Sequence, residues 1–168
     1  MSQKTRIWIV VAALVVVAAV LAGVGFLSQN QATQAPATTP QPGMIHLYVN
    51  GSFAANLLPA EMQKLPAASF VDKEQGKTQK GYWLRDVLQL YVKENALSPS
   101  TQITFTGSRQ GTEKSATVTW AETLDPANHI LFSPSNDGTS VKIAATMDKL
   151  ATRDNWIQGL TQIGVQTK

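Results

Sequence analysis

"GKTQKGYWLRDVLQLYV", from Gly76 to Val92, is the stretch of sequence that decides the fold. A basic, glycine-containing segment runs here into apolar residues with helical spacing, which predicts an amphipathic helix from about Trp83 to Glu94. The segment before it, 72–81, is polar and predicts a loop. Whether that loop is the wall of an active site or only a joint decides whether the chain is an enzyme. The apolar stripe of the helix consists of Leu84, Val87, Leu88, Tyr91 and Val92.

The N-terminal segment predicts a membrane anchor. Residues 7–27 carry no charge and are, at about 21 residues, long enough to cross a bilayer as a helix. Lys4 and Arg6 precede this run and no charge follows until Glu61, so residues 1–6 should be cytoplasmic and the rest extracytoplasmic. A cleaved signal peptide is the alternative to this single-pass anchor in the cell membrane. Residues 28–43, rich in Gln, Thr, Ala and Pro, then predict an extended linker.

Residues 44–168 have the size and patterning of one compact domain. The chain has no cysteine, so this exported domain must be held together by its core, without disulfides or thiolate ligands. Lys4 and Arg6 are two of the 14 basic residues, which leaves twelve basic against 11 acidic residues in the exported part. That near-neutral balance with interspersed signs argues against nucleic-acid binding.

The pattern within residues 44–168 predicts an α+β fold with a mixed sheet. Alternating apolar residues precede Asn50-Gly51, a strong hairpin signal. Thr119 and Glu122 form a capping box that should begin a helical turn near Trp120. The whole predicts about seven strands and two or three short helices, without an internal repeat. Beyond the hairpin and the helix at 83–94, we expect a short helix within 58–66 and strands within 67–71, 101–107, 115–120, 129–133, 140–146 and 156–165.

Motifs for catalysis are weak. The two histidines, His46 and His129, have no partners at metal-ligand spacing, and the sequence has no serine elbow, P-loop or dinucleotide fingerprint. Asp72 and Glu74 are read as a solvated pair in a loop, with calcium binding or acid–base chemistry as the alternative. Three tryptophans of the exported part, Trp83, Trp120 and Trp156, are expected to seal the edges of the core, with a platform for a ligand as the alternative.

The order of these motifs resembles the molybdopterin-binding domain of the sulfite oxidase family. The features that carry the resemblance are the "VNG" turn, "GYWLRDVL" opening a helix, the paired strands within "ITFTGSRQGTEKSATVTW", and the closing "RDNWIQGLTQIGV". The resemblance implies a small form of that fold over the exported part. It also implies a cofactor cleft near the loop before the helix, with Lys77, Lys80, Arg85 and Arg109 beside it.

The same resemblance implies that the original chemistry is lost. In that family a cysteine in this loop gives molybdenum a sulfur ligand, whereas the loop here, "FVDKEQGKTQKG", has none, and a carboxylate does not imitate a soft thiolate. We therefore expect no bound cofactor and no molybdenum catalysis.

Three functions remain open from the sequence. The first is a non-catalytic, membrane-tethered accessory domain that binds a membrane protein, such as a redox complex, or a small ligand in the former cofactor cleft. The second is a molybdopterin-binding oxidoreductase or electron-transfer subunit. The third is a structural subunit of a membrane complex.

Overall fold

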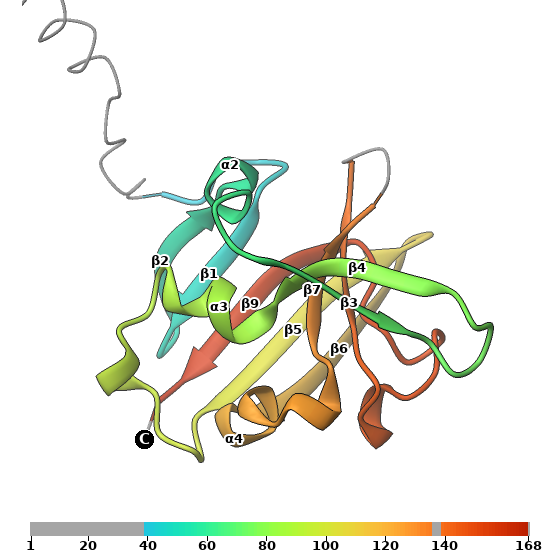
Figure 1. Cartoon of the computed structure of the whole chain (residues 1–168). Coiled ribbons are helices and arrows are strands. Elements are labelled where there is room, and N and C mark those ends of the chain that lie inside the picture. The colour runs from blue at the N-terminus through green and yellow to red at the C-terminus, as the bar shows by residue number, and fades with distance from the viewer. Residues whose placement is uncertain (1–38, 136–138, 168) are drawn as a thin grey trace, which may run out of the picture. The chain divides into compact units, whose positions relative to one another are not determined.

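The computed structural model describes residues 39–135 and 139–167 (Figure 1). The chain divides into two compact units, residues 1–35 and 36–168, and the first lies outside the described residues. So do the predicted membrane helix at 7–27 and most of the predicted linker. Within the described ranges, no helix is long and apolar enough to cross a membrane. The end of the predicted linker contacts the domain, since His46 Nε2 donates to the Gln41 carbonyl at 2.9 Å.

The larger sheet has five strands in the order β2-β1-β9-β5-β6. β1 and β9 are parallel, and the other neighbours in this sheet are antiparallel. The predicted hairpin at Asn50-Gly51 is confirmed, and both residues have the positive φ (51° and 78°) that a tight turn of this kind requires. The strands are β1 (Ile45–Val49), β2 (Ser52–Leu57), β5 (Gln102–Arg109), β6 (Thr112–Thr119) and β9 (Leu160–Gln166).

The smaller sheet has four antiparallel strands in the order β3-β4-β7-β8. Its members are β3 (Ala67–Val71), β4 (Thr78–Trp83), β7 (Leu131–Pro134) and β8 (Val141–Ala144). The prediction of a loop over 72–81 was wrong in its second half, because β4 begins at Thr78. The buried positions early in β4 are not apolar: Gln79 is buried, and Gly81 lets the strand approach the backbone of Phe132. Apolar alternation is therefore missing from this strand.

Three short α-helices occur in the described ranges, α2 (Pro59–Met62), α3 (Leu84–Gln89) and α4 (Trp120–Leu124). The capping box that begins α4 is confirmed. The predicted helix at 83–94 is shorter than expected, because Trp83 belongs to β4 and the chain turns after Gln89. That turn brings the Tyr91 hydroxyl to α2, where it contacts Glu61. Single 3-10 turns lie at Glu94–Ala96, Pro126–Asn128 and Asp148–Leu150.

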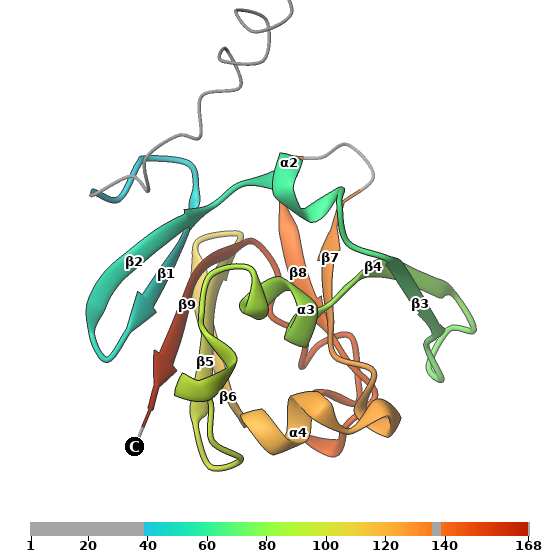
Figure 2. The same cartoon turned by 60° about the vertical axis from the view of Figure 1, so that its left-hand side comes forward.

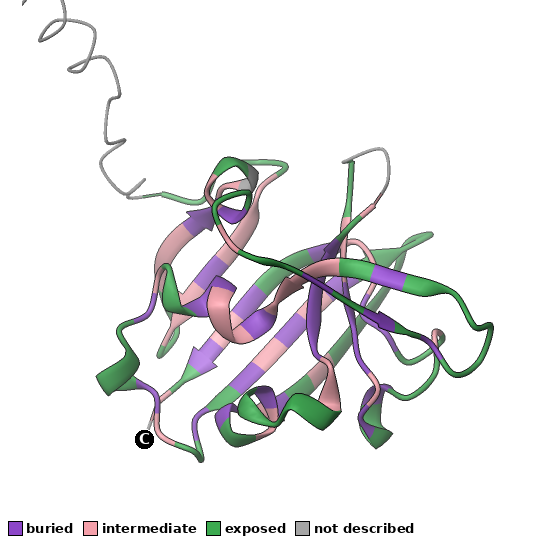
Figure 3. Ribbon diagram, viewed as in Figure 1, coloured by how far each residue is buried: buried purple, intermediate pink, exposed green. Residues whose placement is uncertain are grey.

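The core lies between the two sheets, and Figure 2 shows α3 and α4 on the same side of the larger sheet as the smaller one. Buried positions alternate along β5 and β9, so one face of the larger sheet packs inward (Figure 3). The described domain is β-rich with two sheets and few short helices, which is compatible with the predicted α+β class. The described ranges contain nine strands where about seven were expected, because that number includes neither the second strand of the hairpin, β2, nor β4. The largest fully buried side chains include Leu47, Leu84, Leu88, Ile103, Phe105, Leu131, Phe132, Ile143 and Ile163.

Candidate functional site

Trp156 is the apolar base of the candidate site. Its side chain is buried, and its indole N–H donates to the carbonyls of Ala145 (3.1 Å) and Leu150 (2.9 Å). The ring also meets Phe70 edge-on. These contacts fix both the position and the tilt of the indole. The prediction that tryptophans pack into the core is confirmed for Trp156 and Trp120, whereas Trp83 is only partly buried against it.

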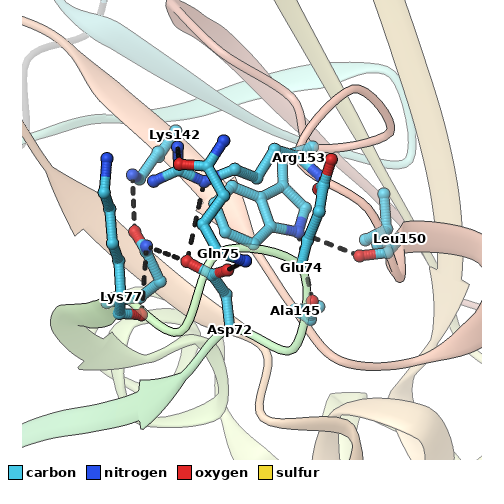
Figure 4. Close-up of polar contacts among 10 residues, drawn as sticks. Asp72, Glu74, Gln75, Lys77, Lys142, Ala145, Leu150 and Arg153 are labelled. Carbon is cyan, nitrogen blue, oxygen red and sulfur yellow. Dashed lines mark hydrogen bonds and ion pairs between the residues drawn. The ribbon is translucent and has the colours of Figure 1, made fainter.

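Two cations lie against this indole (Figure 4). Lys142 Nζ on β8 is 5.2 Å from the ring centroid of Trp156, and Arg153 Cζ is 5.6 Å from it. Both distances fall within the range of favourable cation–π contacts. Burial lowers the pKa of Lys142, and the nearby Arg153 guanidinium lowers it further, while Asp72 opposes the shift. The two positive charges are thus close enough to repel each other, and this makes the charged form of Lys142 less favourable.

Asp72, at the end of β3, holds Arg153 in place. Its carboxylate accepts from the Gln75 N–H (2.6 Å) and from Gln79 Nε2 (2.8 Å), and its Oδ2 lies 3.6 Å from Arg153 Nε. The Gln75 N–H in particular, with Gln79, Arg153 and Lys77, lowers the pKa of Asp72 against the opposing effect of burial. The interpretation of Asp72 and Glu74 as a solvated pair was wrong for Asp72, which is 3% exposed. The turn after β3 folds over its own carboxylate, which a local pattern cannot show.

The β3–β4 hairpin makes further contacts to both cations. Arg153 Nη1 donates to Gln75 Oε1 (2.7 Å), and the Arg153 backbone N–H donates to Glu74 Oε2 (3.0 Å). Lys142 Nζ donates to Gln79 Oε1 at 2.8 Å. Gln79 therefore connects Lys142 to Asp72 through the two ends of one amide. The hairpin acts as a clamp that orients side chains from β8 and from the segment before β9.

Neighbouring cavities open beside these cations. One, of about 380 Å³, is hereafter called the basic cavity. Its lining contains four cationic side chains and, among the described residues, no carboxylate. An adjacent cavity of about 320 Å³ shares Lys142 and Arg153 and is mixed in charge, since it adds Arg109 together with Glu74 and Asp154. The basic cavity is lined by Lys77, Thr78, Gln79, Lys80, Ser133, Pro134, Ser135, Lys142 and Arg153.

The four basic residues predicted from the sequence are not all together. Lys77 and Lys80 line the basic cavity, and Arg109 lines the adjacent one. Arg85 lines neither: it lies on α3, where its guanidinium pairs with Asp86 (3.4 Å) and lies 5.7 Å from the Trp83 ring centroid. That Lys77, Lys80 and Arg109 bind a ligand stays a prediction.

The residues that organise the site, Lys142, Arg153, Gln79 and Asp72, could not be recognised as a group from the sequence. Lys142 interrupts an apolar run predicted to be a strand, and a charge in such a place is a signal that it faces a cleft or a partner. Arg153 lies three residues before Trp156 in the sequence, but no sequence pattern connects it to Asp72. The interactions that hold Gln79 and Asp72 depend on strand pairing that the sequence pattern did not reveal.

No family model and no curated protein sequence gives a significant match to the chain. The likeness to the sulfite oxidase family therefore rests on the motifs quoted above. The donor chemistry of the site does not fit molybdenum held as that family holds it, because the chain has no cysteine. Asp72, in the turn between β3 and β4, already has both carboxylate oxygens engaged by Gln75, Gln79 and Arg153.

Proposed function

We propose that the chain is a membrane-anchored, extracytoplasmic binding protein whose domain holds a small ligand without transforming it. The observation that carries this proposal is the basic cavity, whose Lys142 and Arg153 are held by the β3–β4 hairpin. Side chains fixed in advance lose little entropy on binding, so an oriented pair of cations favours a bound ligand. The uncharged, apolar run at 7–27 and its preceding Lys4 and Arg6 support the anchor and its orientation.

The chemistry of the lining supports binding over catalysis. A general acid or base needs a titratable group that can reach the reacting atom. The buried carboxylate of the site, Asp72, is occupied in orienting Arg153 and Gln79. The other titratable groups of the lining are its cations, and Lys142 and Arg153 among them are held by Gln79 and Gln75. With the hydroxyls, the amide and the proline of the same lining, they can hold and orient a charged molecule.

The scaffold itself is best explained as a reduced sulfite-oxidase-like domain that has exchanged cofactor chemistry for ligand binding. The order of the sequence motifs supports this origin. The absence of a cysteine ligand for molybdenum from the loop supports the loss of the cofactor chemistry. Accordingly, the domain would act beside a membrane partner, for instance a redox complex, to which it supplies a ligand or a ligand-dependent contact.

The test uses the full chain, expressed in cells that synthesise molybdopterin and purified in a mild detergent. We expect recovery in the membrane fraction with an intact N-terminus by mass spectrometry, no molybdenum or pterin, and binding of at least one small molecule from a set that includes anions, cations and neutral compounds. Ligand-observed NMR detects such binding. Stoichiometric pterin would overturn the non-catalytic proposal, and a set without any binder, combined with a single crosslinked membrane protein, would favour a purely structural subunit.

A further inference from the structure

The ligand class follows from the charges of the basic cavity, and this inference rests on the proposed binding function. We infer that the basic cavity binds a small, multiply charged oxyanion of the phosphate or pyrophosphate type between Lys142 and Arg153. Lys77 and Lys80 add further positive charge to the same lining. The anion could be free in solution or belong to a lipid headgroup, because both present the same phosphate oxygens.

The positive charge of the site is only partly compensated. Asp72 is the buried carboxylate that faces Arg153, and Glu74 and Asp154 lie on the side of the adjacent cavity together with Arg109. The only hydrogen bond that Lys142 Nζ makes within the described residues goes to the neutral amide of Gln79. An ammonium group carries three N–H donors, so two remain for a ligand. The Arg153 guanidinium likewise keeps donors beyond the Nη1–H that Gln75 accepts. An anion between the two groups would remove their mutual repulsion.

The number and the type of the cations that line the basic cavity favour a phosphate ligand over a single carboxylate. Arginine matches a carboxylate by paired, parallel N–H bonds, whereas lysine acts as a point charge and is a common phosphate ligand. Three of the four cations that line the cavity are lysines. One carboxylate would leave most of this charge unpaired, whereas a pyrophosphate brings several charges. The low-exposure indole beneath Lys142 and Arg153 also keeps water from one side of the pair.

Gln79 and Asp72 are positioning residues in this arrangement. The amide of Gln79 donates to Asp72 Oδ2 and accepts from Lys142 Nζ, so its orientation is fixed by both partners. Replacing Gln79 would release Lys142 without changing the charge of the cavity. Its loss should therefore weaken binding while the dependence of affinity on salt stays that of the unchanged protein, which separates positioning from charge.

The experiment titrates the full chain in a nonionic detergent with sodium pyrophosphate, inorganic phosphate and acetate by calorimetry. We expect pyrophosphate to bind tightest and acetate weakest, with affinity falling as sodium chloride is added. Lys142→Gln and Arg153→Gln should each weaken pyrophosphate binding about tenfold or more, since each removes a charge-assisted contact. Lys64→Gln is the matched control: Lys64 is exposed and lines neither cavity, and we expect unchanged affinity.

Arg153→Gln removes contacts to the hairpin and could impair folding, so a second variant keeps the test decisive. Lys77→Gln combined with Lys80→Gln changes two exposed side chains of the same lining and should also weaken pyrophosphate binding. Equal binding of acetate and pyrophosphate, or an equal loss in Lys64→Gln, would overturn the inference. Reconstitution into phosphatidylcholine nanodiscs with or without phosphatidic acid identifies the source. If phosphatidic acid competes with pyrophosphate, the ligand is a lipid headgroup. If it does not compete, the ligand is an anion free in solution.

The outcome also separates this inference from the function on which it rests. If a neutral molecule binds and Lys142→Gln abolishes its binding while pyrophosphate does not bind, the ligand class is wrong and the binding function stands. If neither pyrophosphate nor any member of the wider set binds, both fail.

Discussion

Arg153 Nε lies 3.6 Å from Asp72 Oδ2, and this ion pair joins the segment before β9 to the end of β3. The Asp72 carboxylate also accepts from the Gln75 N–H and from Gln79. One buried charge therefore organises a turn, a strand and the cation that follows η3 (Asp148–Leu150). The stability of the domain and the shape of its basic cavity should depend on the ionisation of the same group.

Asp72→Asn should remove an acid-sensitive part of the stability. The pKa of Asp72 is lowered from its ordinary value of 3.8, chiefly by the Gln75 N–H, with Gln79 and Arg153 adding to the effect. A lowered pKa means that the folded state binds the proton less readily than the unfolded state. The contribution is therefore fully present above about pH 3.8 and is lost as the pH falls through the lower folded pKa.

Urea unfolding of both proteins across this acid range measures the effect. We expect the unchanged protein to have the higher free energy of unfolding at neutral pH. Its difference from Asp72→Asn should shrink as the pH falls below the ordinary pKa of the carboxyl group. Glu74→Gln is the control, because Glu74 is exposed in the same turn and contacts the Arg153 backbone N–H. A difference that stays constant with pH would show that Asp72 acts by shape and not by charge.

Gly81→Ala should destabilise the smaller sheet. A Cβ at Gly81 would lie 2.3 Å from the carbonyl oxygen of Phe132, a backbone atom that cannot move aside without shifting β7. Overpacking of this kind costs roughly 1–3 kcal/mol. Gly164→Ala is the matched control, since the nearest atom to a Cβ there is the Thr104 carbonyl oxygen at 3.9 Å. Chemical denaturation should show the large loss at Gly81 only, and equal losses would contradict this account.

The predicted elements that proved right are those with a strong local signal. Asn50-Gly51 requires positive φ at both positions, and the box of Thr119 and Glu122 satisfies the backbone within four residues. β4 was missed because its early buried side chain, Gln79, is polar and has its partners outside the strand, at Asp72 and Lys142. A helix cap or a turn is encoded by a few neighbouring residues, whereas the pairing of strands distant in sequence cannot be recognised from a short segment.

Of the candidate site, the sequence indicates only the segment before α3. Lys77 and Lys80 of that segment line a cavity, and that the cavity binds a ligand stays a prediction. The contacts that give this cavity its character come from Lys142 and Arg153, which are distant in sequence from the loop that holds them. Arg85 lines neither cavity, because the helix that carries it turns this side chain toward Trp83. Long-range contacts and side-chain direction are tertiary properties.

Thr119→Ala should weaken α4 by about 1 kcal/mol, as loss of an N-cap usually does. The Thr119 hydroxyl accepts from the Glu122 N–H (3.2 Å), and Glu122 Oε2 accepts in return from the Thr119 N–H (2.6 Å). Burial raises the pKa of Glu122, but the Lys149 ammonium and the Thr119 donors outweigh it and keep the pKa below its ordinary value. Urea unfolding of Thr119→Ala and of the exposed control Thr112→Ala checks this; a change within about 0.5 kcal/mol is expected for the control.

Tyr91→Phe should cost about 1–2 kcal/mol, because it leaves a partly buried backbone N–H unpaired. The Tyr91 hydroxyl accepts from the Leu58 N–H (3.0 Å) and donates to Glu61 Oε2 (2.7 Å), which ties α2 to the turn after α3. Tyr48→Phe is the control, since it keeps the ring that meets Phe53. Urea unfolding should show the loss for Tyr91→Phe and little change for the control.

The same hydroxyl should titrate abnormally late. Burial raises the pKa of Tyr91 well above its ordinary value of 10.0, and Glu61 adds to the shift while the Leu58 N–H opposes it. The pKa of Tyr91 is higher in the folded than in the unfolded protein, so the protonated hydroxyl stabilises the fold. This stabilisation is fully present below about pH 10 and is lost as the pH rises above that value. Subtracting the tyrosinate absorbance of Tyr91→Phe from that of the unchanged protein isolates this group. A difference that titrates near pH 10 in the folded protein would mean that water reaches the hydroxyl and that the link between α2 and the turn after α3 is open in solution.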